Sequence, residues 1–259
     1  MYKELTGGVE MRQQLFVVGD IHGEYDMLVK LLEQWDKKTQ TLLFVGDLAD
    51  RGLNSKACIE LVYRLVAAGD AICLTGNHEQ LFLQFLEQPD TFYGNYLING
   101  GASTISSLLP DLRQSTAQPT EIAEKIKDQY PDLIAFISSM PLYFEWHHYL
   151  FVHAGVDLSL PDWKETPTKD FYWIREPFHR GINQTGKVIV FGHTPTPGLH
   201  NADYNYDNWE SDNKIGIDGG AVFGGILHGL VFDQNTLVAH YGVQKKNDVP
   251  ECITYIEGT

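Results

Sequence analysis

Five short motifs place metal-ligating or acid–base side chains next to glycine, and each motif directly follows a run of strand-forming residues. In chain order they are GDIHG at 19–23, GDLADRG at 46–52, GNHE at 76–79, HAG at 153–155 and GHTP at 192–195. In open α/β sheets, ligands bind beyond the carboxyl ends of the strands. We therefore expect the five loops to converge on one site, where the glycines allow tight turns and a close approach to an ion.

Each motif has an ordinary structural explanation when it is taken alone. A Gly-Asp pair after a strand is usually a turn, because the aspartate hydrogen-bonds its own backbone. Yet a given four-residue string such as 76–79 arises by chance in about one window in 160,000, so five clusters in one chain make coincidence a poor explanation. The histidines outside the motifs lack such a pattern and are interpreted as packing or surface residues: His147, His148, His179, His200, His228 and His240.

The motifs supply six oxygen or imidazole ligands and no thiolate: Asp20, His22, Asp47, Asn77, His153 and His193. This donor set suits Mn²⁺, Fe or Zn²⁺ and argues against copper(I) or iron–sulfur chemistry. Six side chains are too many for one tetrahedral ion, but they fit two ions that share a carboxylate. Two divalent ions, two ionised aspartates and a bridging hydroxide leave a charge of about +1, and Arg51 adds another, so the site would attract a phosphate dianion.

The elements that must position these motifs alternate along the front of the chain. Short β-branched and aromatic runs predict strands at 15–18, 41–45, 71–74, 149–152, 188–191, 226–232 and 237–241. Apolar residues at three- and four-residue steps predict helices over 25–35 and 55–68, and this strand–helix order favours an α/β layered sheet. The polar stretch 197–213 lacks periodicity and is expected to be a surface loop.

The length of 259 residues suits one large domain, or a domain with a substantial insertion. We expect a single domain over 11–259, with 1–10 as an N-terminal extension. Residues 80–145 are expected to form a mostly helical insertion, in which Thr120 would cap a helix over 121–130.

The overall composition limits the partners of this chain. Lys and Arg number 19 against 34 Asp and Glu, which gives a net charge of −15. Such a surface repels polyphosphate backbones and anionic lipid, so neither nucleic acid nor a membrane is expected as a partner. Three scattered cysteines are too few for a disulfide framework or a thiolate metal site. Apolar runs are far shorter than the ~20 residues of a spanning helix, and the first residues do not resemble a signal peptide, so a cytoplasmic location is expected.

Together the motifs resemble the phosphoprotein phosphatase family of calcineurin-like dinuclear metallophosphoesterases, whose pattern is GDxHG, GDxxDRG, GNHE, HxG and GH. Within that family the chain is most similar to the small bacterial and phage-lambda-type serine/threonine protein phosphatases. These share NYLINGG at 95–101, WIR at 173–175 and IDGGAV at 217–222. The resemblance covers about 15–232 and implies an α/β fold in which two mixed β-sheets form a sandwich flanked by helices.

The resemblance also implies a role for each site residue. The first metal would be held by Asp20, His22 and Asp47, and the second by Asp47, Asn77, His153 and His193. His78 would be the general acid that protonates the leaving oxygen, and Asp50 the carboxylate that orients it. Arg51, Arg175 and Asn77 would bind the phosphate; for Arg175, an ordinary helix-end or surface arginine is the alternative.

The activity implied by the resemblance is hydrolysis of phosphoserine and phosphothreonine in proteins, through attack by a metal-bridging hydroxide, with phosphotyrosine open as a further substrate. Two divalent ions are expected, with manganese preferred and iron or zinc as alternatives. A hydrolase of diadenosine tetraphosphate or another nucleotide is the alternative function, although such enzymes usually carry aspartate in place of Glu79. A catalytically silent scaffold is disfavoured because no ligand of the pattern is missing.

Overall fold

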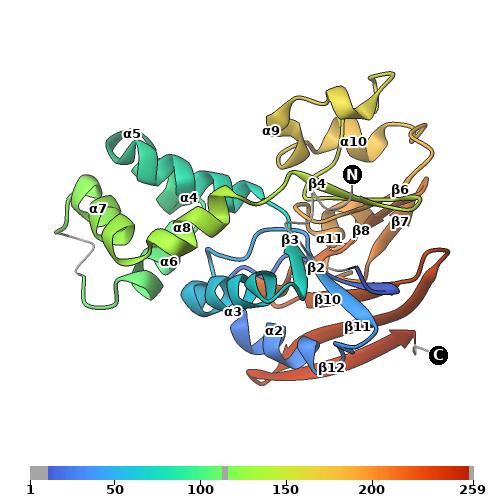
Figure 1. Cartoon of the computed structure of the whole chain (residues 1–259), viewed down its shortest axis with the longest axis horizontal. Coiled ribbons are helices and arrows are strands. Elements are labelled where there is room, and N and C mark those ends of the chain that lie inside the picture. The colour runs from blue at the N-terminus through green and yellow to red at the C-terminus, as the bar shows by residue number, and fades with distance from the viewer. Residues whose placement is uncertain (1–10, 113–115, 257–259) are drawn as a thin grey trace.

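The structure is a computed structural model that describes residues 11–112 and 116–256, so the proposed N-terminal extension lies outside the described residues. Two β-sheets lie face to face, and helices cover the outer side of each sheet (Figure 1). The expected α/β sandwich of two mixed sheets flanked by helices is therefore confirmed.

The strands are β1 (Gln14–Val18), β2 (Gln40–Phe44), β3 (Ala71–Cys73), β4 (Tyr143–Trp146), β5 (Tyr149–Val152), β6 (Val188–Phe191), β7 (Trp209–Ser211), β8 (Lys214–Gly216), β9 (Asp218–Gly219), β10 (Ile226–Phe232), β11 (Leu237–Lys246) and β12 (Val249–Ile256). The helices are α2 (Tyr25–Leu32), α3 (Ser55–Ala67), α4 (Asn77–Glu87), α5 (Pro89–Ile98), α6 (Gly101–Leu108), α7 (Pro119–Gln129), α8 (Pro131–Ser138), α9 (Thr168–Phe171), α10 (Glu176–Arg180) and α11 (Thr196–His200), with short 3₁₀ turns η1 (Trp163–Glu165) and η2 (Ala221–Phe223).

The larger sheet has the strand order β12-β11-β10-β1-β2-β3, with β9 paired to β10. Strands β1, β2 and β3 are parallel, whereas β10 pairs antiparallel with both β1 and β11. Side chains alternate across β1, as the period of a strand requires. Phe16 and Val18 pack in the same core as residues of α2 and α3, while Leu15 and Val17 face the second sheet.

The smaller sheet has the order β4-β5-β6-β8-β7, with β5, β6 and β8 parallel. Its inner face contributes Phe151 and Val190 to the core between the sheets, where Phe151 meets Phe232 of β10 with ring centroids 5.9 Å apart. Its outer face contributes Leu150 and is covered by residues that include Phe178 of α10. The parallel strands of both sheets end at one edge of the sandwich, and there the five motifs begin.

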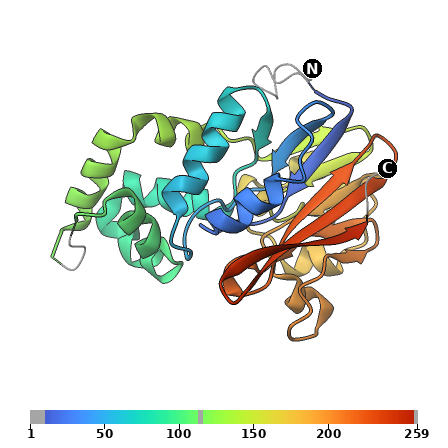
Figure 2. The ribbon, with the colours of Figure 1, turned by 90° about the horizontal axis from the view of Figure 1, so that it is seen from below.

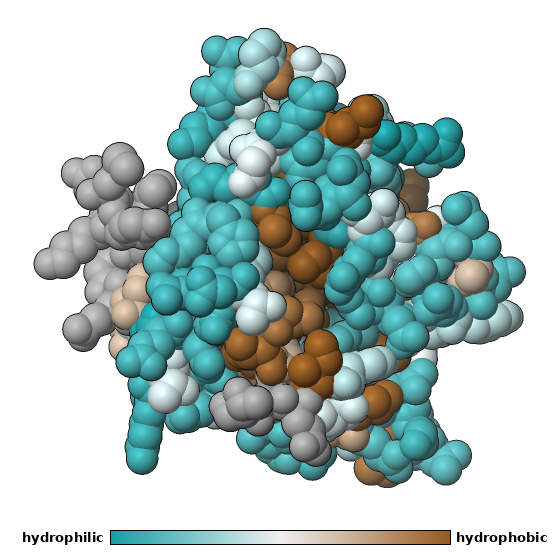
Figure 3. All heavy atoms as spheres, turned by 90° about the vertical axis from the view of Figure 1, so that its right-hand side faces the viewer, coloured by the Kyte–Doolittle hydropathy of each residue, from teal (hydrophilic) through white to brown (hydrophobic). Residues whose placement is uncertain are grey.

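Helices α4 to α8 form a group that stands beside the sheets rather than over them (Figures 1 and 2). Helix α4 begins at Asn77, and only three residues separate it from the end of β3, so the group starts at the edge where the motifs meet. On the right-hand side of Figure 1 the surface is largely hydrophilic, with a central band of hydrophobic residues (Figure 3). None of the described helices is long and apolar enough to cross a membrane.

The structure corrects the sequence-based predictions in three places. Helix α7 begins at Pro119 with Gln118 as its N-cap, so Thr120 lies within the helix and does not cap it. The stretch 197–213 contains most of α11 and all of β7, and is not only a loop. Strands β4, β7, β8, β9 and β12 were not predicted. Several of these are short, and their strand character depends on pairing with a neighbour rather than on their own residues.

Candidate dinuclear metal centre

Several motif residues share an unusual backbone conformation. Left-handed φ angles occur at His22 (47°), Asp47 (52°), Asp50 (69°), Arg51 (69°) and His193 (66°). Non-glycine residues rarely adopt this region, and such conformations persist where the surroundings over-determine them. Their concentration in three of the five loops indicates that the fold holds these side chains in place for a function.

Glu79 is the buried carboxylate that ties two of the loops together. It accepts hydrogen bonds from the backbone N–H groups of Gly76 (2.8 Å), Asp47 (2.8 Å) and Leu48 (2.9 Å). Burial raises the pKa of Glu79, and the nearby Asp47 carboxylate adds to this effect. The last residue of GNHE therefore fixes the backbone of Asp47, although the sequence alone suggested no role for it.

Two glycines allow the loops to approach the carboxylates closely. A Cβ atom on Gly76 would collide with the Asp47 carboxylate, and one on Gly192 would collide with the Asp20 carboxylate. Glycine is therefore required at both positions by the space available, and not only by the turn.

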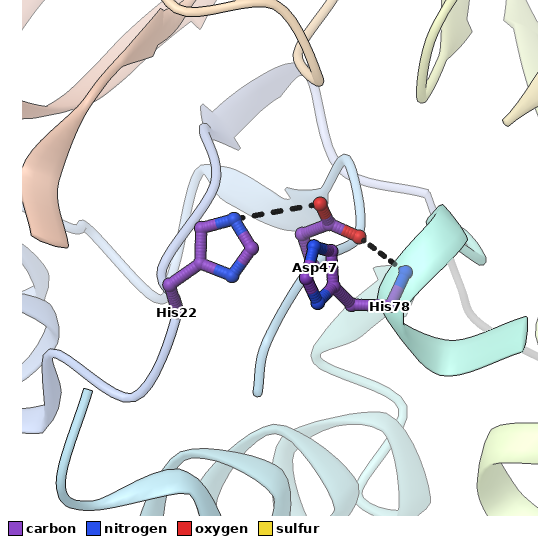
Figure 4. Close-up of side chains that lie close together, drawn as sticks. All are labelled: His22, Asp47 and His78. Atoms are coloured by element: carbon purple, nitrogen blue, oxygen red, sulfur yellow. Dashed lines mark hydrogen bonds and ion pairs between the residues drawn. The ribbon is translucent and has the colours of Figure 1, made fainter. Parts of the chain in front are cut away.

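His22 and Asp47 form one half of the centre (Figure 4). His22 Nδ1 lies 2.8 Å from the Ala49 carbonyl oxygen, to which it donates, and this leaves Nε2 without a proton when the ring is neutral. That Nε2 lies 3.5 Å from Asp47 Oδ2. Burial lowers the pKa of His22 well below its usual value, which favours the neutral ring that a metal needs.

His153, His193 and Asn77 form the other half. His153 Nδ1 donates to the Val45 carbonyl oxygen at 2.9 Å, so its Nε2 faces Asp47 Oδ2 at 3.4 Å and Asn77 Oδ1 at 3.1 Å. His193 Nδ1 lies 2.7 Å from the same Asn77 oxygen. Asp47 Oδ2 is thus close to an imidazole of each half, as the predicted shared carboxylate requires.

Asp20 lies in the same centre. One oxygen, Oδ2, accepts from the His193 backbone N–H at 2.9 Å, whereas Oδ1 is buried and has no hydrogen-bond partner among the described residues. Burial raises the pKa of Asp20 well above its usual value, and Asp218 adds to the shift. A buried carboxylate oxygen without a partner is costly, and it is the kind of atom that a cation would satisfy.

The donors therefore fit divalent ions. Two donors bound to one ion at 2.0–2.2 Å, with angles between the octahedral and tetrahedral values, lie about 2.8–3.6 Å apart. The separations between Asp47 Oδ2 and the two imidazoles, 3.5 Å and 3.4 Å, fall in this range. Within the part of the chain that the structure describes, two groups of His, Cys, Asp or Glu offer ligand atoms within 4.8 Å of one another, and both contain Asp47: His22, Asp47 and His78; Asp47, His153 and His193. The first group includes His78 where the sequence predicted Asp20. Both ring nitrogens of His78 already have partners, Nδ1 with Asp50 Oδ2 at 2.7 Å and Nε2 with Arg51 Nη2 at 2.8 Å.

His78 and Asp50 form a fully buried pair beside this centre. The His78 ring meets the His22 ring edge-on, with centroids 4.6 Å apart. Arg51 Nη2 lies 2.8 Å from His78 Nε2, and Arg51 Nη1 contacts His22 Nε2. The predicted acid, its carboxylate partner and one predicted phosphate-binding group therefore lie together: His78, Asp50 and Arg51.

Arg175 joins the centre from the N-cap of α10. Its Nη1 donates to Thr194 Oγ1 at 2.8 Å, one residue beyond His193. Partial desolvation lowers the pKa of this otherwise exposed arginine, while the carboxylates of Asp218 and Asp20 oppose that shift. Arg175 is exposed and stands at the end of a helix, so its position fits both the predicted phosphate-binding role and the alternative of a helix-end or surface arginine.

Sequence reasoning gave no role to Asp218, which lies in IDGGAV at 217–222. Asp218 is buried, and burial raises its pKa to about 6. Phe223, which follows that motif, is exposed and lies over the Arg51 guanidinium with 5.4 Å between Cζ and the ring centroid. The motif itself was the available signal, but no spacing within it indicated what its residues would touch.

A groove of about 330 Å³ opens beside the centre, between α4–α5 and the segment that follows α9. Trp173 lies at its inner end, with its ring centroid 6.1 Å from that of His193. The lining consists of amides, aromatic rings, one leucine and one lysine: Asn77, Gln80, Leu81, Gln84, Phe92, Asn95, Lys169, Tyr172 and Trp173.

Residues 14–225 match the calcineurin-like phosphoesterase family, and the chain belongs to this family. It is 30% identical over 228 residues to serine/threonine-protein phosphatase 1 of Salmonella typhimurium, covering 83% of this chain and 90% of the relative. It is 27% identical over 251 residues to the asymmetrical bis(5'-nucleosyl)-tetraphosphatase PrpE of Bacillus velezensis, covering 86% and 90%.

Among solved structures, that of a proposed diadenosine tetraphosphatase superposes with a TM-score of 0.61 at 20% identity, over 91% of this chain and 95% of the other. This likeness shows a shared fold. Family membership makes the chain a metallophosphoesterase, and the fold implies divalent metal ions. The two relatives act on different substrates, so similarity leaves the substrate undecided.

Proposed function

We propose that this metallophosphoesterase is a phosphomonoesterase that hydrolyses phosphoserine and phosphothreonine in proteins. The observation that carries the proposal is the buried His78–Asp50 pair. A serine or threonine alkoxide is a poor leaving group and needs a proton as its bond to phosphorus breaks. General acid catalysis of such a step is worth typically 10²–10⁴-fold, whereas an anhydride leaves as a phosphate that needs less help.

In the proposed reaction each residue of the pair has a separate task. His78 Nδ1 is committed to Asp50 Oδ2 at 2.7 Å, so the proton for the leaving oxygen would come from Nε2. Arg51 Nη2, which lies 2.8 Å from Nε2 in this structure, would turn to the phosphate for this step, because a guanidinium can only donate. Asp50 would stabilise the imidazolium. Arg51 and Arg175 would bind phosphate oxygens, because planar guanidinium groups match them in a fork, and Asn77 would add its amide.

The proposed metal ligands divide between two sites that share Asp47. The first would consist of Asp20, His22 and Asp47, and the second of Asp47, Asn77, His153 and His193. When bound, two divalent ions neutralise charge on the phosphate and lower the pKa of water at the site. We propose manganese, with iron or zinc as alternatives, because the ligands are oxygen and imidazole nitrogen without sulfur.

The groove beside Asn77 supports a peptide substrate. Its amide side chains can both donate to and accept from an extended peptide backbone, and its aromatic rings offer apolar contact. Lys169 is the one charged residue in its lining. Beyond the centre itself, with its arginines and proposed metal ions, the groove would offer a tetraphosphate chain this single cation.

A nucleotide hydrolase is the second candidate, because the PrpE relative is nearly as similar as the protein phosphatase and is covered to the same extent. One experiment separates the two. The purified protein with Mn²⁺ is offered a phosphoserine peptide, p-nitrophenyl phosphate and diadenosine tetraphosphate, with and without EDTA.

We expect hydrolysis of both monoesters, abolished by EDTA, with kcat/KM for the peptide above that for the dinucleotide. Faster turnover of the dinucleotide would contradict the protein phosphatase function and favour the nucleotide hydrolase. No turnover of any substrate with manganese, iron or zinc would contradict an enzymatic role.

A further inference from the structure

We propose that Tyr96 is a positioning residue of the acid pair: its hydroxyl, together with that of Thr104, fixes the Asp50 carboxylate that holds His78. This inference rests on the proposed acid role of His78. Tyr96 lies in α5 and Thr104 in α6, so both come from the helical group and not from the sheets that carry the metal ligands.

The hydrogen bonds to Asp50 divide cleanly between its two oxygens. Oδ2 is bonded to His78 Nδ1 at 2.7 Å. Oδ1 accepts from the Tyr96 hydroxyl at 2.7 Å and from the Thr104 hydroxyl at 2.6 Å. All four side chains are buried. With two donors on one oxygen, the carboxylate cannot rotate about its Cβ–Cγ bond without breaking them, so the oxygen that faces His78 keeps its direction.

The NYLINGG motif at 95–101 has a physical explanation in this arrangement. Gly101 leaves room for the Tyr96 ring, since a Cβ there would lie 2.6 Å from its Cγ. Gly100 has a left-handed φ of 98°, and its carbonyl oxygen accepts from the Arg51 backbone N–H at 3.1 Å. Thr104 also accepts from the Asp50 backbone N–H at 2.9 Å. The segment therefore holds both Asp50 and Arg51 in their left-handed conformations.

The two hydroxyls also satisfy a buried carboxylate oxygen. A buried polar atom without a hydrogen-bond partner is costly. Tyr96 and Thr104 each present a hydroxyl to Asp50 Oδ1. Burial of Tyr96, with Asp50 beside it, raises the pKa of the phenol, so the hydroxyl keeps the proton that it donates.

A purely structural role for Tyr96 is the competing explanation. Its ring stacks on Phe85, with centroids 5.2 Å apart and planes 12° apart, and lies near Phe82. The Tyr96→Phe variant keeps the ring and removes only the hydroxyl. It therefore separates the two explanations, because packing is retained while the donor to Asp50 is lost.

The test measures kcat and KM for a phosphoserine peptide and for p-nitrophenyl phosphate, whose leaving group needs little protonation. In Tyr96→Phe we expect kcat for the peptide to fall about tenfold or more, a part of the 10²–10⁴-fold that a general acid contributes. We expect kcat for p-nitrophenyl phosphate to fall less than about threefold, with KM and metal content unchanged. Thr104→Val loses the second donor to Oδ1 and also the hydroxyl that accepts from the Asp50 backbone N–H. It should change the ratio of the two kcat values in the same direction.

Tyr93→Phe is the matched control. Tyr93 lies on the same helix and contacts the same Phe85, with ring centroids 5.6 Å apart, but is not bonded to Asp50. We expect this variant to leave both activities unchanged.

His78→Asn, measured beside these variants, distinguishes a failure of the inference from a failure of the proposed function. Suppose that His78→Asn lowers kcat for the peptide selectively, whereas Tyr96→Phe and Thr104→Val lower kcat for both substrates equally or not at all. The positioning role is then wrong and the acid role stands. If His78→Asn lowers both equally, the acid role fails, and with it the inference. Should Tyr96→Phe not fold, Thr104→Val alone decides.

Discussion

Replacement of Glu79 by glutamine tests whether the second and third motifs are held together as the structure indicates. The carboxylate has three backbone partners: Oε2 accepts from Asp47 and Gly76, and Oε1 accepts from Leu48. Glutamine keeps the shape and one acceptor oxygen. Whichever way the amide turns, its NH₂ group must face at least one N–H, where two donors oppose each other.

The magnitude follows from this count. The best orientation of the amide loses the single bond to Leu48, and a hydrogen bond to a charged group contributes about 1.5–3 kcal/mol. The two remaining bonds become neutral and lose roughly half of their strength. Burial raises the pKa of the Glu79 carboxyl group, which means that its charged form is costly to bury. Replacing it by a neutral amide removes this cost and offsets part of the loss. We expect Glu79→Gln to lower the free energy of unfolding by about 3 kcal/mol, which is roughly 6–12 °C in Tm for a chain of this size.

Metal binding should weaken as well, because Glu79 fixes the backbone of the shared ligand Asp47. Loss of such an outer contact typically costs 10–100-fold in metal affinity. Thermal unfolding in EDTA measures the first effect, and calorimetric titration with Mn²⁺ measures the second. Glu87→Gln is the control, because Glu87 is exposed on the same helix. A Glu79→Gln protein with the Tm and Mn²⁺ affinity of the unchanged chain would refute the reasoning.

Two further predictions concern the shared ligand and a second buried cluster. Asp47→Asn should weaken the binding of both metal ions together. Elemental analysis that still finds two ions per chain would exclude Asp47 as the shared ligand. His228 and His240 are buried and bonded to each other at 2.9 Å, and burial lowers their pKa values to about 4 and about 3. In the unfolded chain these two imidazoles take up protons near pH 6.5, whereas in the folded chain they do so only at the lower pKa values. The free energy of unfolding, measured in EDTA, should therefore fall as the pH drops from about 6.5 to 4, by about 3 kcal/mol for His228. His228→Gln should make this pH dependence less steep. An unchanged slope in the variant would show that His228 does not cause the fall.

The sequence identified the loops of the centre because metal ligation and tight turns demand particular residues at particular spacings. Asp20, Asp47 and His153 each follow a run of buried strand residues, and that order predicts a common edge without any coordinates. The long apolar runs likewise predicted the central strands, because a strand buried on both faces must be continuously hydrophobic.

The second sheet could not be read from residues in the same way. Strands such as β7 and β8 are three residues long, and pairing with neighbours decides their conformation. The resemblance, rather than periodicity, indicated that sheet. Helix ends were also inexact, because Thr120 satisfies a capping preference at a position where the chain is already helical.

By itself, the sequence determined which chemistry the chain can support, since ligand types and glycine spacing are local properties. Only the tertiary structure decided which side chains hold that chemistry in place. Glu79 reaches the backbone of Asp47 across 32 positions of the chain, and Thr104 reaches Asp50 across 54. Such contacts leave no local pattern, because they arise where separate elements pack against each other.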